Sequence, residues 1–65
     1  MVSRLERPVV RIEVTCVLNE ITALIYECRH ALHAQQDEAL AVLAQRIAVQ
    51  ARVIQRLTKP GQVQP

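Results

Sequence analysis

The stretch VRIEVTCVLNEITALIYECRHAL, residues 10–32, decides the fold expected for this 65-residue chain. Apolar residues recur in it at alternating spacings of four and three, which is typical of a helix that packs along one side. The predicted seam consists of Val14, Leu18, Ile21, Ile25, Cys28 and Leu32. A second apolar stripe lies beside it at strict spacings of seven, formed by Val10, Val17, Leu24 and Ala31. Another face, expected to meet solvent, carries Glu6, Glu13, Glu20 and Glu27.

A competing period appears at the start of this stretch. Residues 9–15 alternate between apolar and polar and are rich in β-branched side chains, which also suits a β-strand. We favour a helix because the heptad spacing continues through the segment without a break.

The second half of the chain carries its own seam, formed by Leu40, Leu43, Ile47, Gln50, Ile54 and Leu57. Its phase is shifted by one residue from that of the first seam, and the shift falls within residues 33–38. The sequence therefore predicts an all-α fold, an antiparallel two-helix hairpin with helices near 8–34 and 37–58. Asp37 is the expected N-cap of the second helix. The alternative is one long coiled coil with a single skip residue.

Helix-breaking residues bracket this region, since Pro8, Pro60, Gly61 and Pro65 all lie at its ends. Proline is well tolerated in the first turn of a helix, where its missing N–H has no helical partner. We expect a single helical-hairpin domain over residues 1–59 and a disordered C-terminal tail over residues 60–65.

The second helix has more apolar surface than one packing seam uses. Beside the seam it carries an alanine stripe and a valine stripe, formed by Ala41, Ala44, Ala48, Ala51 and by Val42, Val49, Val53. A hairpin covers one stripe per helix, so we expect the chain to dimerise into a four-helix bundle or to dock on a partner. The residues expected to form the core and the self-association surface are Leu18, Ile21, Ile25, Leu32, Leu40, Leu43, Ile47 and Ile54.

The hexapeptide CRHALH, residues 28–33, gathers the only two histidines and one of the two cysteines. On a helix, Cys28 lies about 200° from His30 and about 140° from His33, so the three cannot ligate one metal ion. We expect no metal and no cofactor. Tyr26, His30 and His33 are instead candidates for binding a partner, together with Val42, Val49 and Val53.

The sequence shows no pattern typical of an enzyme. It has a single serine, Ser3, a single glycine, and no pair of carboxylates that a fold would bury together. No apolar run is long enough for a membrane span. Cys16 and Cys28 would lie about 18 Å apart on one helix, too far for a disulfide. Free thiols suit a reducing compartment, so we expect a cytoplasmic protein without membrane contact.

The charges are distributed unevenly, because all six acidic residues precede residue 39. In an antiparallel hairpin the two ends of the chain lie together, which predicts a basic pole. Its residues are Arg4, Arg7, Arg11, Arg52, Arg56 and Lys59. These cations complement the dipole at the end of the second helix, or they bind an acidic partner or phosphate groups.

Three functions fit these features. The first is a non-enzymatic helical interaction protein, expected to be a homodimer, that binds and modulates another protein, for example as an inhibitor. The second is a nucleic-acid-binding regulator, either a four-helix RNA or DNA binder or, if residues 9–15 form a strand, a ribbon-helix-helix repressor. The third is a structural subunit of a larger assembly.

Overall fold

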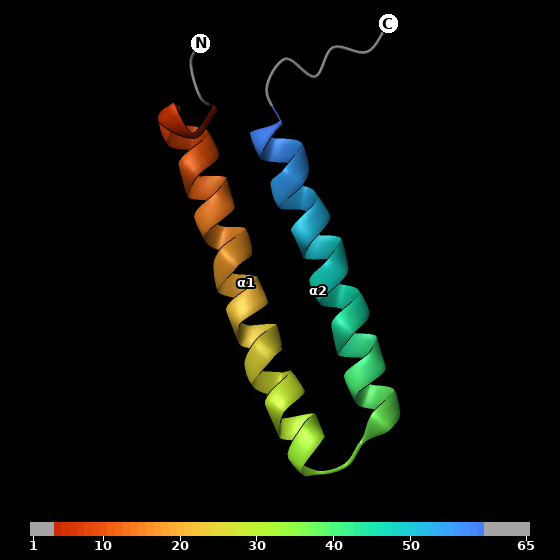
Figure 1. The fold of residues 1–65 in the computed structure, drawn as a ribbon. Helices are drawn as coiled ribbons and strands as arrows, with labels where there is room; N and C mark the ends of the chain where they lie inside the picture. Colours follow the sequence, from red (N-terminus) through yellow and green to blue (C-terminus); the bar gives the residue numbers. More distant parts are fainter. Residues whose placement is uncertain (1–3, 60–65) are drawn as a thin grey trace, which may run out of the picture.

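The computed structural model describes residues 4–59 and consists of two antiparallel helices (Figure 1). A short 3₁₀ turn, η1 (Arg4–Glu6), precedes α1 (Pro8–His33), and a tight turn leads into α2 (Asp37–Thr58). The predicted all-α hairpin is confirmed, with helix bounds within one residue of those expected. The strand alternative for residues 9–15 is wrong, because this segment forms the first turns of α1. The predicted tail, residues 60–65, lies outside the described residues.

The start of α1 follows from its proline. Pro8 lies in the first turn of the helix, where its missing N–H has no helical partner. Arg7 is the N-cap residue with extended backbone, and its carbonyl accepts the N–H of Arg11 at 3.0 Å. The Arg7 side chain makes no capping hydrogen bond, so proline and the apolar spacing fix this boundary.

The turn between the helices is a Schellman motif built without glycine. Gln35 has a φ of 56°, in the left-handed region. The N–H of Gln36 donates to the carbonyl of Ala31 at 2.9 Å, and that of Gln35 donates to Leu32 at 3.1 Å. These are the two bonds that define the motif, and they satisfy carbonyls that α1 leaves unpaired.

The beginning of α2 corrects one prediction. The N-cap residue is Gln36, whose carbonyl accepts the N–H of Leu40 at 3.0 Å, and Asp37 is already the first helical residue. Gln36 is both the last residue of the Schellman motif and the residue directly before the helix. It therefore takes the N-cap position that was expected for Asp37. Asp37 and Glu38 still place negative charge in the first turn, where the helix dipole favours it.

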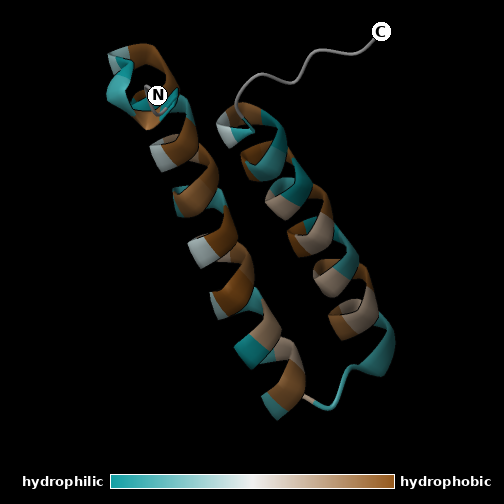
Figure 2. Cartoon of the chain, turned by 45° about the horizontal axis from the view of Figure 1, so that its top comes forward, coloured by the Kyte–Doolittle hydropathy of each residue, from teal (hydrophilic) through white to brown (hydrophobic). Residues whose placement is uncertain are grey.

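The core runs along the contact between the helices, where hydrophobic residues recur on each turn of both (Figure 2). Leu24, Ala31 and Leu43 form its central cluster, and Val10 is buried nearer the open end. Around the cluster pack the partly buried side chains of Cys28, Ala39, Leu40 and Ile47. On α2 this packing side is the predicted seam, whose members are buried or half-buried.

On α1 the packing side differs from the predicted seam. Half of that seam does face α2, since Val14, Ile21 and Cys28 are half-buried. The other half, Leu18, Ile25 and Leu32, is exposed at 49%, 42% and 63%. The side of α1 that packs against α2 is completed instead by the neighbouring stripe of Val10, Val17, Leu24 and Ala31. The two stripes are adjacent and equally apolar, so spacing alone did not decide between them.

Candidate interaction surfaces

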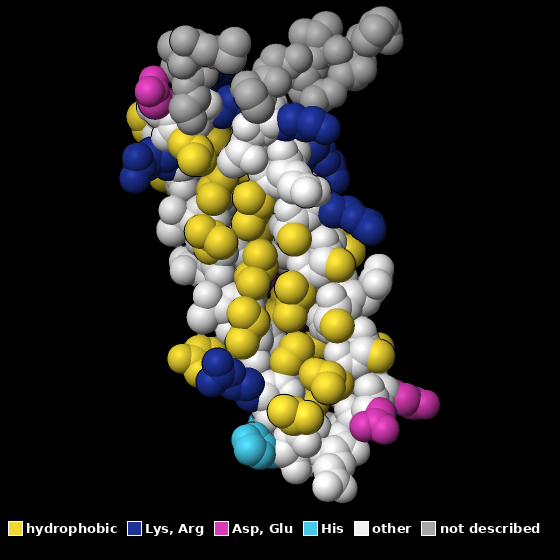
Figure 3. All heavy atoms as spheres, viewed as in Figure 1, with side chains coloured by type: hydrophobic (Ala, Val, Ile, Leu, Met, Phe, Trp, Pro, Cys, Tyr) yellow, Lys and Arg dark blue, Asp and Glu magenta, His cyan; other side chains and the backbone are white. Residues whose placement is uncertain are grey.

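One broad face of the hairpin carries an apolar band. It is formed on α1 by Leu18, Ile25 and Leu32, and on α2 by Ala41, Ala44, Ala48 and Ala51. Each band residue of α1 comes one position after a residue on the packing side, and Ala41, Ala44 and Ala48 follow Leu40, Leu43 and Ile47 of the core in the same way. Each step of one residue along a helix turns the side-chain direction by about 100° about the helix axis. Because the helices are antiparallel, this turn leads from the packing side to the same face of the hairpin on both of them. Hydrophobic side chains accordingly run along both helices in Figure 3.

The band is accessible although it is apolar. On α1 its three side chains are between 42% and 63% exposed. On α2, Ala41, Ala44 and Ala51 are exposed and Ala48 is half-buried. Charged side chains gather toward the ends and edges of this face (Figure 3). The band therefore has bulky residues on one helix, small residues on the other, and a charged surround.

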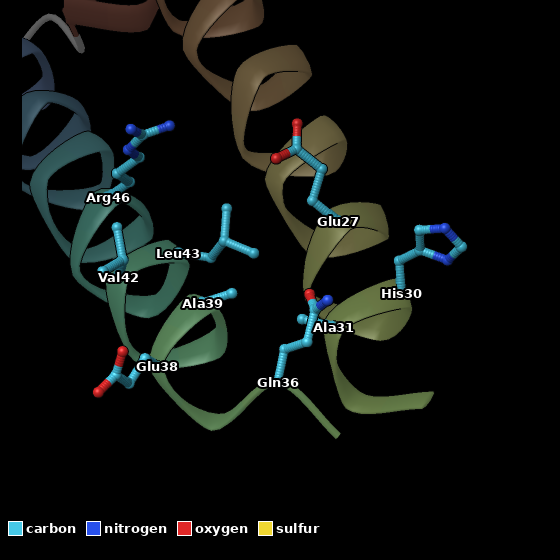
Figure 4. Close-up of a pocket in the computed structure, with 9 residues that line it drawn as sticks. All are labelled: Glu27, His30, Ala31, Gln36, Glu38, Ala39, Val42, Leu43 and Arg46. Carbon is cyan, nitrogen blue, oxygen red and sulfur yellow. The ribbon is translucent and has the colours of Figure 1, made fainter. Parts of the chain in front are cut away.

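The opposite face carries an open hollow of about 500 Å³ near the turn. Figure 4 shows its lining residues, which come from both helices and the turn: Glu27, His30, Ala31, Gln36, Glu38, Ala39, Val42, Leu43 and Arg46. Ala31 and Leu43 belong to the buried core and Ala39 packs against it, so the hollow reaches the core. Glu27, Glu38 and Arg46 are exposed and give it a charged rim.

The structure brings only some of the predicted partner-binding residues together. His30 and Val42 line the hollow from opposite helices. Val49 is 45% exposed and Val53 is half-buried, and both lie further along α2 toward the open end. Tyr26, at 68% exposed, and His33 are accessible but do not line the hollow. Tyr26, His30 and His33 stay about one turn apart along α1, and of the three only His30 is at the hollow.

The charged rim of the hollow was not predicted from the sequence. Glu27 belongs to the glutamate ladder that was expected to lie fully in solvent, and Arg46 was assigned no role. A signal was available, because Glu27 and Arg46 are six and nine residues from the helix ends at the turn. Antiparallel helices bring residues at similar distances from their turn to similar heights.

The cysteines and histidines do not converge on one point. Cys28 is half-buried on the packing side, whereas Cys16, His30 and His33 are exposed. Both cysteines are free thiols. Within residues 4–59, no group of three or more histidine, cysteine or acidic side chains is arranged to hold a metal ion.

The residues assigned to the basic pole lie toward the open end, where the start of α1 is beside the end of α2 (Figure 1). Arg4 has a structural role there, because its Nε donates to the carbonyl of Leu57 at 3.0 Å. That bond satisfies one of the last carbonyls of α2, which have no helical partner. The other five basic residues are exposed: Arg7, Arg11, Arg52, Arg56 and Lys59.

Comparison with known proteins identifies no relative: no family model, no curated protein and no solved structure matches the chain. Neither helix within the described part of the chain is both long and apolar enough to cross a membrane. The surfaces described above are therefore the basis for a functional proposal.

Proposed function

We propose that this chain is a small non-enzymatic interaction protein that associates with a second copy of itself and binds and modulates another protein. The observation that carries the proposal is the apolar band, which the hairpin leaves exposed along both helices. Contiguous apolar surface with a charged surround is characteristic of protein–protein contact sites. With both thiols free, the protein would suit a reducing cytoplasm.

The thin core supports the same proposal. Among residues 4–59, the side chains at most 8% exposed are Val10, Leu24, Ala31 and Leu43. Two helices alone bury little apolar surface, and small helical units commonly gain stability by associating. A second hairpin laid on the apolar band would convert its exposed leucines and isoleucine into core.

The hollow on the opposite face is the proposed site for the other protein. Its apolar floor can accept a hydrophobic side chain, and its rim offers both acidic and basic groups for hydrogen bonds. The rim suits a peptide segment of mixed charge better than a phosphate group, because Glu27 and Glu38 would repel an anion.

Sedimentation equilibrium over a concentration series tests the self-association. We expect the wild type to form dimers and Ala48→Glu to remain monomeric, because the substitution puts a charge in the dry contact. Gln45→Glu is the matched control, since Gln45 is exposed and lies two residues after Leu43, on the outer side of α2. A wild-type chain that stays folded and monomeric at tens of micromolar would contradict the homodimer.

Capture experiments with purified dimer test the binding of another protein. The wild type and a Val42→Glu variant would be compared, after sedimentation has shown that both form the same dimer. A specific partner retained by the wild type and lost by the variant supports the hollow as the binding site. Equal retention by both would place the contact elsewhere on the molecule.

A nucleic-acid-binding regulator is the second candidate, and the five exposed cations at the open end favour it. Only the version that binds through a helical bundle still applies, because the ribbon-helix-helix version needs a strand where α1 begins. A gel-shift titration at several salt concentrations tests it. Binding that weakens steeply with salt, and weakens further in an Arg52→Gln and Arg56→Gln double variant, would favour this candidate.

A further inference from the structure

We infer that the second copy docks on the apolar band head to tail, so that the turn of each hairpin lies beside the open end of its partner. The inference rests on the proposed self-association and adds its geometry. The two-fold axis crosses the helices at right angles at the height of Ile25, and it passes between Ala44 and Ala48 of α2.

The apolar residues of α1 are arranged symmetrically about Ile25. Leu18 lies seven residues before it and Leu32 seven residues after it. When two such helices pack antiparallel, Ile25 meets its own symmetry mate, and Leu18 meets the partner's Leu32. A two-fold contact requires this reciprocity, in which residue i of one copy touches residue j of the other and the reverse.

The alanines of α2 have the same property. Ala41, Ala44, Ala48 and Ala51 are symmetric about the midpoint between Ala44 and Ala48. In an antiparallel α2–α2 contact, Ala44 meets the partner's Ala48, and Ala41 meets the partner's Ala51. Small side chains allow these two helices to approach more closely than the two α1 helices.

The two centres of symmetry lie at the same height in the hairpin. Ile25 is eight residues before His33, the last residue of α1. At a rise of about 1.5 Å per residue, this is about 12 Å from the turn. The midpoint of Ala44 and Ala48 is nine residues after Asp37, the first residue of α2, which is about 13.5 Å from the turn. A single two-fold axis can therefore relate α1 to the partner's α1 and α2 to the partner's α2.

The charges at the two ends complement each other in this arrangement. The open end, residues 4–13 and 52–59, has six basic against two acidic side chains. The turn end, residues 27–38, has three acidic against one basic side chain: Glu27, Asp37 and Glu38 against Arg29. Head-to-tail docking places each basic end beside an acidic turn. The other two-fold arrangement, with both turns at one end, would bring twelve basic side chains together.

Site-directed cross-linking tests the geometry. In a Cys16→Ser, Cys28→Ala background, single cysteines are introduced by Ile25→Cys, Leu18→Cys, Leu32→Cys or Ala51→Cys and treated with a short bis-maleimide. Sedimentation first checks that each variant keeps the oligomeric state of the wild type. Pairs of variants are mixed unfolded and refolded together so that their chains exchange.

We expect covalent dimers from the Ile25→Cys chain alone and from the mixture of Leu18→Cys with Leu32→Cys chains. Neither member of that mixture should cross-link by itself. Covalent dimers from the mixture of Leu18→Cys with Ala51→Cys chains would instead indicate turns at the same end, because those positions lie at similar heights on α1 and α2. That pattern in a sedimenting dimer overturns the head-to-tail arrangement and leaves the homodimer intact, whereas a monomer in sedimentation removes the self-association itself.

Discussion

The substitution of leucine by alanine can be made at a buried position, Leu24, and at an exposed position, Leu18. Leu24 is 7% exposed within the core cluster, and Leu18 is 49% exposed on the apolar band. Leu24→Ala should lower the free energy of unfolding by about 2–3 kcal/mol, near the low end for buried leucines because a core between two helices collapses easily. In an isolated hairpin, Leu18→Ala removes a side chain that is already about half in solvent and should cost about 1 kcal/mol.

The proposed dimer changes the expectation for Leu18. Covering its exposed half would contribute about a further 1 kcal/mol from each chain. A dimer contains two such residues, so Leu18→Ala should weaken association by about 2 kcal/mol, which is about thirty-fold in Kd. Leu24→Ala acts mainly within each hairpin, so it should lower stability at every protein concentration.

Urea unfolding followed by circular dichroism separates these effects when it is repeated over a range of protein concentrations. The wild-type midpoint should rise with concentration, because dimerisation stabilises the folded chain by mass action. For Leu18→Ala the same rise should appear only at higher concentration. If the midpoints of the wild type and of Leu18→Ala do not depend on concentration, the reasoning is refuted and the band is uncovered in solution.

Three further predictions concern single features of the hairpin. Gln35→Gly should raise the free energy of unfolding by about 0.5–1 kcal/mol, because glycine adopts a positive φ without strain; a loss of stability in urea unfolding would contradict this. Arg4→Met should lower the free energy of unfolding by about 1 kcal/mol, because it removes the hydrogen bond to the last turn of α2. In the same urea unfolding experiment, Arg7→Met should leave the free energy of unfolding unchanged. Finally, Cys16 should react with a thiol reagent faster than the half-buried Cys28, and comparing the Cys16→Ser and Cys28→Ser variants would show whether the order is reversed.

The helices and their bounds follow from local features of the amino-acid sequence. Pro8, the apolar spacing and the phase shift within residues 33–38 act locally, because a helix forms from hydrogen bonds between residues four apart. The seam of α2 was equally readable, since the residues on its other sides are smaller or more polar than Leu40, Leu43 and Ile47. The tight turn carried no such signal, because Gln35 takes a left-handed conformation that usually marks glycine.

Which stripe of α1 becomes core depends on how the two helices pack against each other. The stripes that contain Leu18 and Leu24 are both apolar and differ by about 100° around the helix. Which stripe faces α2 depends on where the turn places α2 around the axis of α1. The path of the turn follows from the backbone of Gln35 and Gln36. The same choice leaves Leu18, Ile25 and Leu32 exposed and brings His30, Val42 and Arg46 around one hollow. Both candidate surfaces thus depend on the relative rotation of two helices, a property that no single helix sequence contains.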